Sequence, residues 1–280
     1  MNKKRSMIGL AIIALAITII VSGCTTGTGP TATPGATETP TEKIELTVFA
    51  AASLTDCFTE MKNAFMASNE NIDVVTNFDG SQALRTQIEQ GAYADVFASA
   101  STKHMNAVKD AGYMVNDTVV NFANNKLCVI TPKDNPANVN TLSDLANPGV
   151  KIVIGTPECP VGAYAVQIID KMGNDSAYGP EYKQKVLDNV VSKETTVTMV
   201  VSKVALGEAD AGFVYVSDVP QEYKEKVNII SIPDNLNVIA VYPIGVLDES
   251  GRQDSAKKFV DFVKSSEGKA ILEKYGFTGV

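Results

Sequence analysis

The stretch that opens the folded part of the chain reads IELTVFAAASLTDCF, residues 44–58. Its first half is rich in β-branched and aromatic residues, which favour a strand. In its second half Leu54 and Phe58 begin an apolar pattern at helical spacing, so a strand is predicted to pass directly into a helix. Ser53 stands at the junction with Asp56 three residues later, a weak form of the capping box. A strand that leads into a helix is the repeating unit of an α/β fold.

The same alternation continues to the C-terminus. Helical patterns separate further strand-like runs, and two amphipathic helices are predicted to close the chain, at 254–263 and 267–275. Such alternation predicts mainly parallel sheets flanked by helices, with ligands at the carboxyl ends of the strands. The length suits two α/β lobes with a cleft between them better than a single core. The further strand-like runs are 72–78, 95–99, 126–131, 151–155, 211–216 and 238–246.

The N-terminal region has the pattern of an exported, lipid-anchored protein. Positive charges at residues 3–5 precede an apolar run at 7–21, which is too short to span a bilayer comfortably, and Cys24 follows at once. This predicts a lipoprotein signal peptide over residues 1–23 and lipidation of Cys24, on the outer face of the cytoplasmic membrane. An uncleaved membrane anchor is the alternative. Residues 24–43, rich in Thr, Pro and Gly, are predicted to form a flexible tether.

Composition excludes several classes of function. The 280 residues include 24 Lys+Arg against 32 Asp+Glu, a net charge of −8, so the basic excess that binds nucleic acid is absent. One His and four Cys without a C-x-x-C pair disfavour a His-rich metal site or structural zinc. His104 has no catalytic partner at motif spacing and is interpreted as a surface residue. No G-x-S-x-G motif accompanies Ser53 or Ser81, which disfavours a secreted Ser hydrolase.

Four predicted helix starts share a feature that bears on function. Each leaves unpaired backbone N–H groups at the positive end of a helix dipole, and these together favour an anion. A predicted strand also delivers Tyr215 to its carboxyl end, where a phenol could donate to the same anion. One such junction is ordinary in an α/β fold, but four that could converge suggest a binding site. The four starts lie at Ser53, at Ser81, at Val161 and at Val197.

These segments resemble those of the molybdate-binding proteins of ABC importers, over nearly the whole folded part. The resemblance is carried by five motifs in the same order and spacing. It implies a two-lobed, periplasmic-binding-protein-like fold of type II, no enzymatic activity and no cofactor. The motifs are TVFAAASLTD (47–56), GSQALRTQIEQGAYADVFASAS (80–101), CPVGAYA (159–165), LGEADAGFVYVSD (206–218) and KYGFTG (274–279).

Carried over position by position, the resemblance implies how a tetrahedral oxyanion, molybdate or tungstate, would be held. Hydroxyl donors would be Ser53, Ser81 and Tyr215, and main-chain donors would be the amides of Val161 and Val197. No cationic side chain takes part in this scheme. Lobe 1 would comprise residues 44–127 plus 241–280, and lobe 2 residues 128–240.

The chain departs from the family pattern in two places, and alternatives remain open. Gly80 stands where consecutive Ser residues are frequent, and the stretch before Pro160 is one residue short, which affects the assignment of the amide. A related tungstate and molybdate group adds carboxylate ligands, for which Asp79 and Glu158 are the candidates, although acidic side chains beside a dianion more often point to solvent. The expected partners are permease and ATPase subunits of an ABC importer, with the protein a monomer. Sulfate or another tetrahedral oxyanion is the alternative ligand, and a surface interaction protein without a small ligand the alternative class.

The remaining cysteines leave two possibilities. Cys57 lies one turn into the first predicted helix and Cys159 just before the third, so the two could approach each other across a closed cleft. Buried free thiols, with Cys128 as the third, are the favoured interpretation.

Overall fold

The computed structural model describes residues 43–219 and 225–280. The predicted signal peptide, Cys24 and all but the last residue of the predicted tether therefore lie outside the described residues. Among the described residues no helix has the length and apolar character needed to cross a membrane.

The first of two five-stranded sheets has the order β2-β1-β3-β10-β4. Its strands are β1 (Ile44–Ala51), β2 (Ile72–Asp79), β3 (Val96–Ala98), β4 (Val120–Asn125) and β10 (Ala240–Val246). The helices of this lobe are η1 (Ala52–Leu54), α1 (Thr55–Ser68), α2 (Ser81–Glu89), α3 (Thr102–Asp110), η2 (Asn116–Thr118), α7 (Gln253–Lys264) and α8 (Ser266–Lys274).

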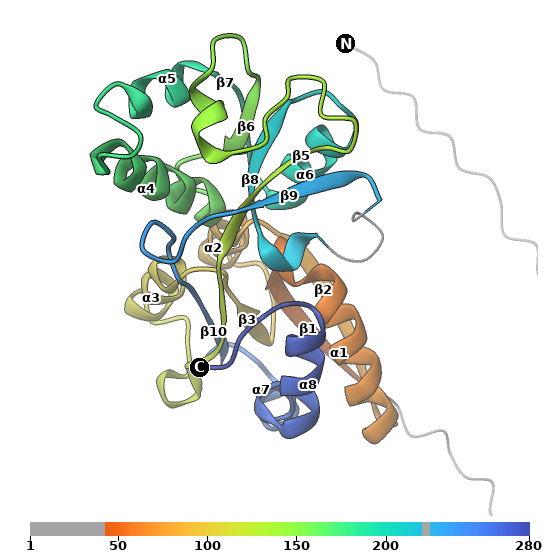
Figure 1. Ribbon diagram of the computed structural model, residues 1–280. Helices are drawn as coiled ribbons and strands as arrows, with labels where there is room; N and C mark the ends of the chain where they lie inside the picture. The colour runs from red at the N-terminus through yellow and green to blue at the C-terminus, as the bar shows by residue number, and fades with distance from the viewer. Residues whose placement is uncertain (1–42, 220–224) are drawn as a thin grey trace, which may run out of the picture. The chain divides into compact units, whose positions relative to one another are not determined.

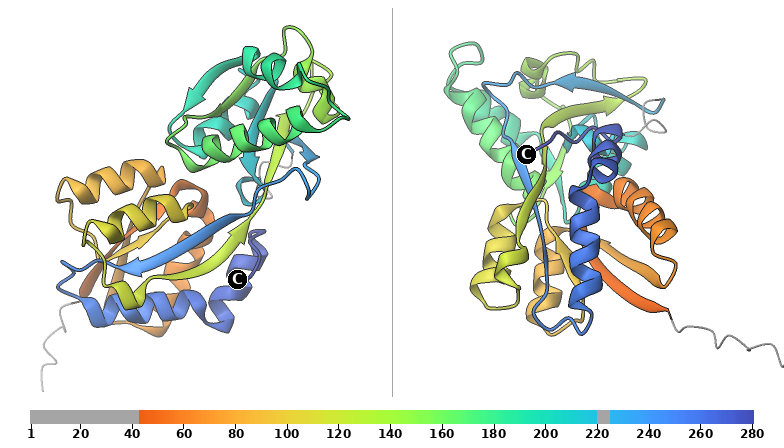
Figure 2. Two further views of the ribbon diagram at one scale, coloured as in Figure 1. Left: turned by 90° about the vertical axis from the view of Figure 1, so that its left-hand side faces the viewer. Right: turned by 90° about the horizontal axis from the view of Figure 1, so that it is seen from below.

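The second sheet has the order β7-β6-β8-β5-β9 and carries its own helices (Figure 1). Its strands are β5 (Leu127–Pro132), β6 (Ile152–Gly155), β7 (Val190–Glu194), β8 (Ala211–Tyr215) and β9 (Val227–Ser231). The helices of this lobe are η3 (Leu142–Ala146), α4 (Pro160–Asn174), α5 (Tyr182–Asp188), α6 (Val197–Ala205) and η4 (Val216–Asp218). The predicted two-lobed α/β fold is confirmed, and Figure 2 shows helices against each sheet.

The pairing within each sheet is more mixed than the sequence predicts. In the first sheet β1 pairs in parallel with β2 and β3, whereas β10 runs antiparallel to β3 and β4. In the second, β6 pairs in parallel with β7 and β8, whereas β5 runs antiparallel to β8 and β9. The expectation of mainly parallel sheets is corrected on this point. The antiparallel strands adjoin the two segments where the chain passes between the sheets, β4 to β5 and β9 to β10.

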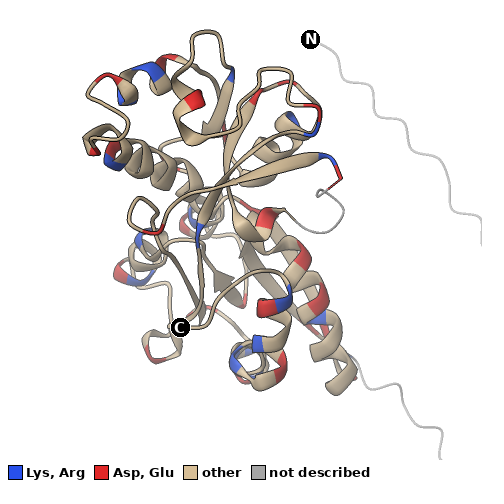
Figure 3. Cartoon of the chain, viewed as in Figure 1, with Lys and Arg blue, Asp and Glu red and all other residues tan. Residues whose placement is uncertain are grey.

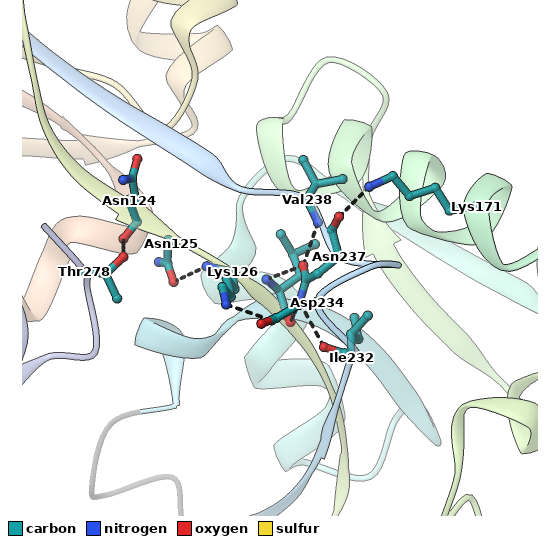
Figure 4. A network of polar contacts seen from close by, with 10 residues as sticks. Asn124, Asn125, Lys126, Lys171, Ile232, Asp234, Asn237, Val238 and Thr278 are labelled. Carbon is teal, nitrogen blue, oxygen red and sulfur yellow. Dashed lines mark hydrogen bonds and ion pairs between the residues drawn. The ribbon is translucent and has the colours of Figure 1, made fainter. Parts of the chain in front are cut away.

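Polar contacts tie the two crossing segments together (Figure 4). Asn237 exchanges two hydrogen bonds with the backbone of Leu127: its Oδ1 accepts from the amide at 3.1 Å, and its Nδ2 donates to the carbonyl at 2.8 Å. Lys126 Nζ lies 2.7 Å from Asp234 Oδ1. Near the C-terminus, Thr278 pairs through its backbone with Asn124. The crossings are thus held side by side by the Asn237 side-chain amide, which mimics strand pairing, and by an ion pair.

Apolar spacing explains how α1 packs. Its buried residues Phe58, Met61 and Phe65 are spaced by three and four positions, and with Cys57, four before Met61, they form one face. The rings of Phe58 and Phe65 meet Phe259 of α7 edge-on, with centroids 6.1 and 5.2 Å apart. Each fully buried Phe contributes about 1.5–3 kcal/mol through the area removed from water. This packing fixes the helix that follows Ser53.

Candidate functional site

Two serines of the first lobe lie where strands give way to helices. Ser53 belongs to η1, directly after β1, and is 9% exposed; its Oγ lies 2.9 Å from Oη of Tyr242 on β10. Ser81 is the first residue of α2, directly after β2, and is 1% exposed. Its Oγ accepts a hydrogen bond of 3.0 Å from the amide of Ala100. Because that bond uses a lone pair, the Ser81 proton remains free to be donated elsewhere.

Two helix starts of the second lobe supply backbone N–H groups. Val161 lies in the first turn of α4, behind Pro160, and Val197 is the first residue of α6; both are buried. The first N–H groups of a helix have no partner within it. Gly162 permits the start of α4 to approach β6, since a Cβ there would lie 2.2 Å from the carbonyl oxygen of Gly155.

Cys159 lies next to the start of α4. Burial raises the pKa of its thiol to about 11, while hydrogen bonds from the amides of Val161 and Gly162 act in the opposite direction. Sulfur is a weak acceptor. These two N–H groups therefore point toward the Cys159 side chain at the start of α4.

Tyr215 ends β8 and is 1% exposed. Its hydroxyl oxygen is buried and has no hydrogen-bond partner among the described residues. Burial raises the pKa of the phenol well above its ordinary value, so the group keeps its proton and is a donor at physiological pH. Its ring packs edge-on against Tyr164 and Tyr242, with centroids 6.5 and 5.8 Å away. Since a buried hydroxyl normally has a partner, this one indicates a place for an acceptor.

Contacts between the lobes bring these helix starts together. Gln82 Nε2, one residue beyond Ser81, donates to the Thr195 carbonyl at 2.7 Å. A second contact between the lobes joins His104 Nε2 of α3 to the Glu158 carbonyl, 2.9 Å apart. In addition, η1 packs against α6. The structure thus places the predicted donors of the two lobes on facing elements.

The prediction for His104 is wrong. Its side chain is 4% exposed, and its Nε2 contacts the Glu158 carbonyl of the second lobe. Burial lowers the pKa of the imidazole. A single-sequence pattern cannot show this, since the contacted residue lies 54 positions further on.

The two carboxylate candidates are placed differently. Asp79 Oδ1 accepts a 2.7 Å hydrogen bond from the amide of Gly80, and Oδ2 lies 3.5 Å from Gln87 Nε2. Glu158 is exposed, and only its backbone carbonyl bonds to the other lobe. Across residues 43–219 and 225–280, no group of three or more His, Cys, Asp or Glu side chains is arranged to hold a metal ion.

The predicted donors carry no charge, and the three described cysteines form no disulfide. The five predicted donors are uncharged residues, and Lys and Arg are spread over the helices of both lobes (Figure 3). Cys57, Cys128 and Cys159 are all free and buried, as the favoured interpretation predicts, and Cys57 is not bonded to Cys159. Burial raises the pKa of both Cys57 and Cys128 to about 12, so these thiols remain protonated.

A cavity of about 210 Å³ lies on another side of Ser53, between η1–α1 and the second lobe. It is lined in part by Asp56 and Asp218, and it does not include the other four predicted donors. Asp218 Oδ2 accepts a 2.9 Å hydrogen bond from the Tyr215 amide. Burial raises the pKa of this carboxyl to about 8, with a smaller contribution from Asp56. The sequence analysis assigned no role to Asp218. It also did not indicate Tyr242 or Asn125, whose contacts with Ser53 and Ser217 join segments 189 and 92 positions apart.

Two lobes of this topology, with donors on their facing edges, define the class of two-lobed proteins that bind a small solute between lobes. The chain belongs to the family of bacterial extracellular solute-binding proteins, whose model matches residues 46–278. Because this is a family of binding proteins, the prediction that the chain is not an enzyme is confirmed.

Three similar proteins give this assignment detail. The molybdate-binding protein ModA of Mycobacterium tuberculosis H37Rv is 38% identical over 232 residues, 83% of this chain and 84% of the relative. The putative ABC transporter substrate-binding lipoprotein YvgL of Bacillus subtilis 168 is 32% identical over 280 residues, 99% of both chains. The solved substrate-binding domain of a putative molybdenum ABC transporter from Clostridium difficile superposes with a TM-score of 0.64 at 31% identity, covering 85% of this chain and 100% of the domain. The resemblance found in the sequence is therefore confirmed.

Proposed function

We propose that the protein captures molybdate or tungstate outside the cytoplasmic membrane and delivers it to the permease of an ABC importer. The observation that carries the proposal is the Tyr215 hydroxyl, a protonated donor buried without a partner at the edge where the two lobes meet. Ser81, with a lone pair already used by Ala100, is oriented to donate in the same way. The ligand is cargo, and the proposal needs no cofactor.

A site made of donors selects for the charge state of its ligand. An unprotonated dianion can accept at each oxygen, whereas hydrogen phosphate brings a proton for which a donor-only site offers no acceptor. A buried polar group without a partner is unfavourable, so phosphate should bind least well. Sulfate is also unprotonated but smaller, and a rigid set of donors spaced for molybdate would contact it poorly.

Closure of the two lobes is the proposed mechanism of capture. Lobe 1, residues 44–127 plus 241–280, would present Ser53 and Ser81, and lobe 2, residues 128–240, would present Val161, Val197 and Tyr215. The Gln82–Thr195 and His104–Glu158 hydrogen bonds support this mechanism, because they join the lobes directly beside those residues. Lipidation of Cys24 would hold a monomer at the outer face of the membrane. Coordination by Asp79 or Glu158 is not part of the mechanism.

Sulfate is the second candidate ligand. The sulfate-binding protein of Synechococcus elongatus is 23% identical over 298 residues, spanning 98% of this chain. That identity is well below the 38% shared with the molybdate-binding relative. Molybdate is therefore preferred.

Calorimetric titration with molybdate, tungstate, sulfate and phosphate tests the proposal. Ser53→Ala and Ser81→Ala should each weaken molybdate binding about 10- to 100-fold, the loss expected for a hydrogen bond to a charged group. Ser176→Ala, an exposed loop position, is the matched control and should bind like the parent. Equal affinity for sulfate and molybdate would contradict the proposal. Ester turnover that Ser53→Ala abolishes would instead support a hydrolase.

A further inference from the structure

A chain of buried polar side chains lies behind Ser53. Ser53 Oγ is 2.9 Å from Tyr242 Oη, and Tyr242 is fully buried. The side chain of Asn125, 2% exposed at the end of β4, lies beside the same phenol and acts to lower its pKa. Asn125 Nδ2 also donates to Ser217 Oγ of the second lobe at 2.8 Å. The chain thus runs from the segment that crosses between the lobes to the proposed ligand donor.

The hydrogen bond between the Lys126 amide and Asn125 determines the direction of the others. The amide of Lys126 donates to Asn125 Oδ1 at 2.9 Å, which turns the Asn125 oxygen toward the backbone (Figure 4). The Asn125 NH₂ group, which can only donate, therefore faces Ser217 and Tyr242.

Tyr242 must then donate its own proton to Ser53. Among the described residues, Ser53 Oγ lies within hydrogen-bond distance of its hydroxyl, and Asn125 beside it has its oxygen turned toward the Lys126 amide and so presents no acceptor. The opposite direction would leave a buried phenolic proton without an acceptor, which is unfavourable. A phenol is also a better donor than an aliphatic hydroxyl, because its oxygen shares a lone pair with the ring.

We propose that Tyr242 and Asn125 are positioning residues that fix Ser53 as a hydrogen-bond donor to the oxyanion. Ser53 Oγ accepts from Tyr242, so its own proton points away from that partner and toward the ligand. Ser81 is set by the same principle, with the Ala100 amide as its donor. The inference rests on the proposed function and adds to it the groups that determine the polarity of one of its donors.

A double-mutant cycle tests whether Tyr242 acts through Ser53. Calorimetric titration with molybdate would compare the parent with Tyr242→Phe, Ser53→Ala and the double variant. Tyr242→Phe should weaken binding about 3- to 10-fold, and the double variant should bind no more weakly than Ser53→Ala alone. Ser217→Ala is the control: it removes the other acceptor of the Asn125 amide and should change affinity less than about 2-fold.

Asn125→Asp tests the polarity itself. A carboxylate accepts from Tyr242, which then accepts from Ser53, so Ser53 would present a lone pair to the ligand. The ratio of molybdate to hydrogen phosphate affinity should fall about 10-fold at pH 8, where both probes carry two negative charges and the added charge cancels from the ratio. If Asn125→Asp does not give the parental circular dichroism spectrum, it is left out, and the double-mutant cycle of Tyr242 and Ser53 alone tests the proposal. If the parent binds molybdate, additive losses in the cycle or an unchanged ratio in folded Asn125→Asp would overturn the positioning role of Tyr242 and Asn125. If the parent binds no oxyanion, the proposed function and the positioning role both fail.

Discussion

Replacing Tyr215 with Phe should change stability and binding in opposite directions. The substitution removes a buried hydroxyl that has no partner among the described residues and leaves the ring packed against Tyr164 and Tyr242. A buried polar group without a partner costs about 1–3 kcal/mol. Allowing for a slightly looser fit of the ring, we expect the variant to be more stable than the parent by about 1 kcal/mol in buffer without oxyanion, an increase in Tm of about 2–4 °C.

With molybdate present the order should reverse. A hydrogen bond to a charged acceptor is worth about 1.5–3 kcal/mol, so its loss weakens binding about 10- to 100-fold. At a fixed, saturating concentration the stabilisation by ligand should therefore fall by about 1.4–2.7 kcal/mol. Because Tyr215 lies on the second lobe, the loss should appear mainly as faster release.

Thermal unfolding with and without molybdate, followed by stopped-flow measurement of both rate constants, makes the comparison. Tyr164→Phe is the matched control, since the hydroxyl of this neighbouring Tyr hydrogen-bonds Ser101. That variant should lose stability in buffer. Our reasoning would be refuted if Tyr215→Phe were less stable than the parent in buffer and showed the parental shift with molybdate. A slower on-rate with an unchanged off-rate would refute the role in release.

Three further predictions concern closure and pH. Gly80→Ala places a Cβ 2.6 Å from the Thr195 carbonyl of the other lobe, so molybdate affinity should fall about 10-fold by calorimetry while the free energy of unfolding changes by less than about 1 kcal/mol. The Asp218 carboxyl, with its pKa raised to about 8, binds a proton in the folded state that the unfolded chain releases above about pH 4. Stability should therefore fall as pH rises from about 4 to 8. In denaturant titrations Asp218→Asn should remove this dependence on pH. At pH 8 the variant should be more stable than the parent by roughly a few kcal/mol. The pKa of His104 is lowered from 6.5 by burial, so its contribution to stability is present above that pH and is lost as pH falls below it. His104→Gln should flatten thermal unfolding temperatures between about pH 5 and 7, and an unchanged profile would contradict this.

The sequence was informative where the determinants are local. The junction of β1 with η1, the start of α2 at Ser81 and the start of α6 at Val197 were predicted from strand-like runs followed by helical spacing. The three strands it missed, β4, β7 and β9, are edge strands of their sheets. Their partly exposed, Asn- or Lys-containing sequences lack the apolar runs that mark central strands.

Long-range contacts explain the rest. Ser53 and Tyr242 touch although 189 positions separate them, and no local pattern around Tyr242 shows that its hydroxyl meets a serine. His104 was misassigned for the same reason, because the carbonyl that its ring contacts lies on the other lobe. A buried Tyr in an otherwise apolar strand is nevertheless a signal, since its polar tip normally needs a partner. Applied to residues 240–246, that rule would have indicated Tyr242, though not Ser53 as the partner.

The division between local and long-range determinants follows the chemistry of the site. A helix start offers N–H groups wherever a strand ends, so the backbone donors come with the α/β fold itself and need only small residues nearby, such as Gly162. A hydroxyl is different, because it can donate or accept, and its polarity depends on what bonds to its oxygen from behind. For Ser81 that group is a backbone amide of a neighbouring loop, whereas for Ser53 it is a phenol on the strand that returns from the second lobe. Reversing the hydrogen bond behind Ser53, as Asn125→Asp should do, is therefore expected to change which oxyanion is preferred, whereas replacing Ser53 or Ser81 should lower affinity for every oxyanion.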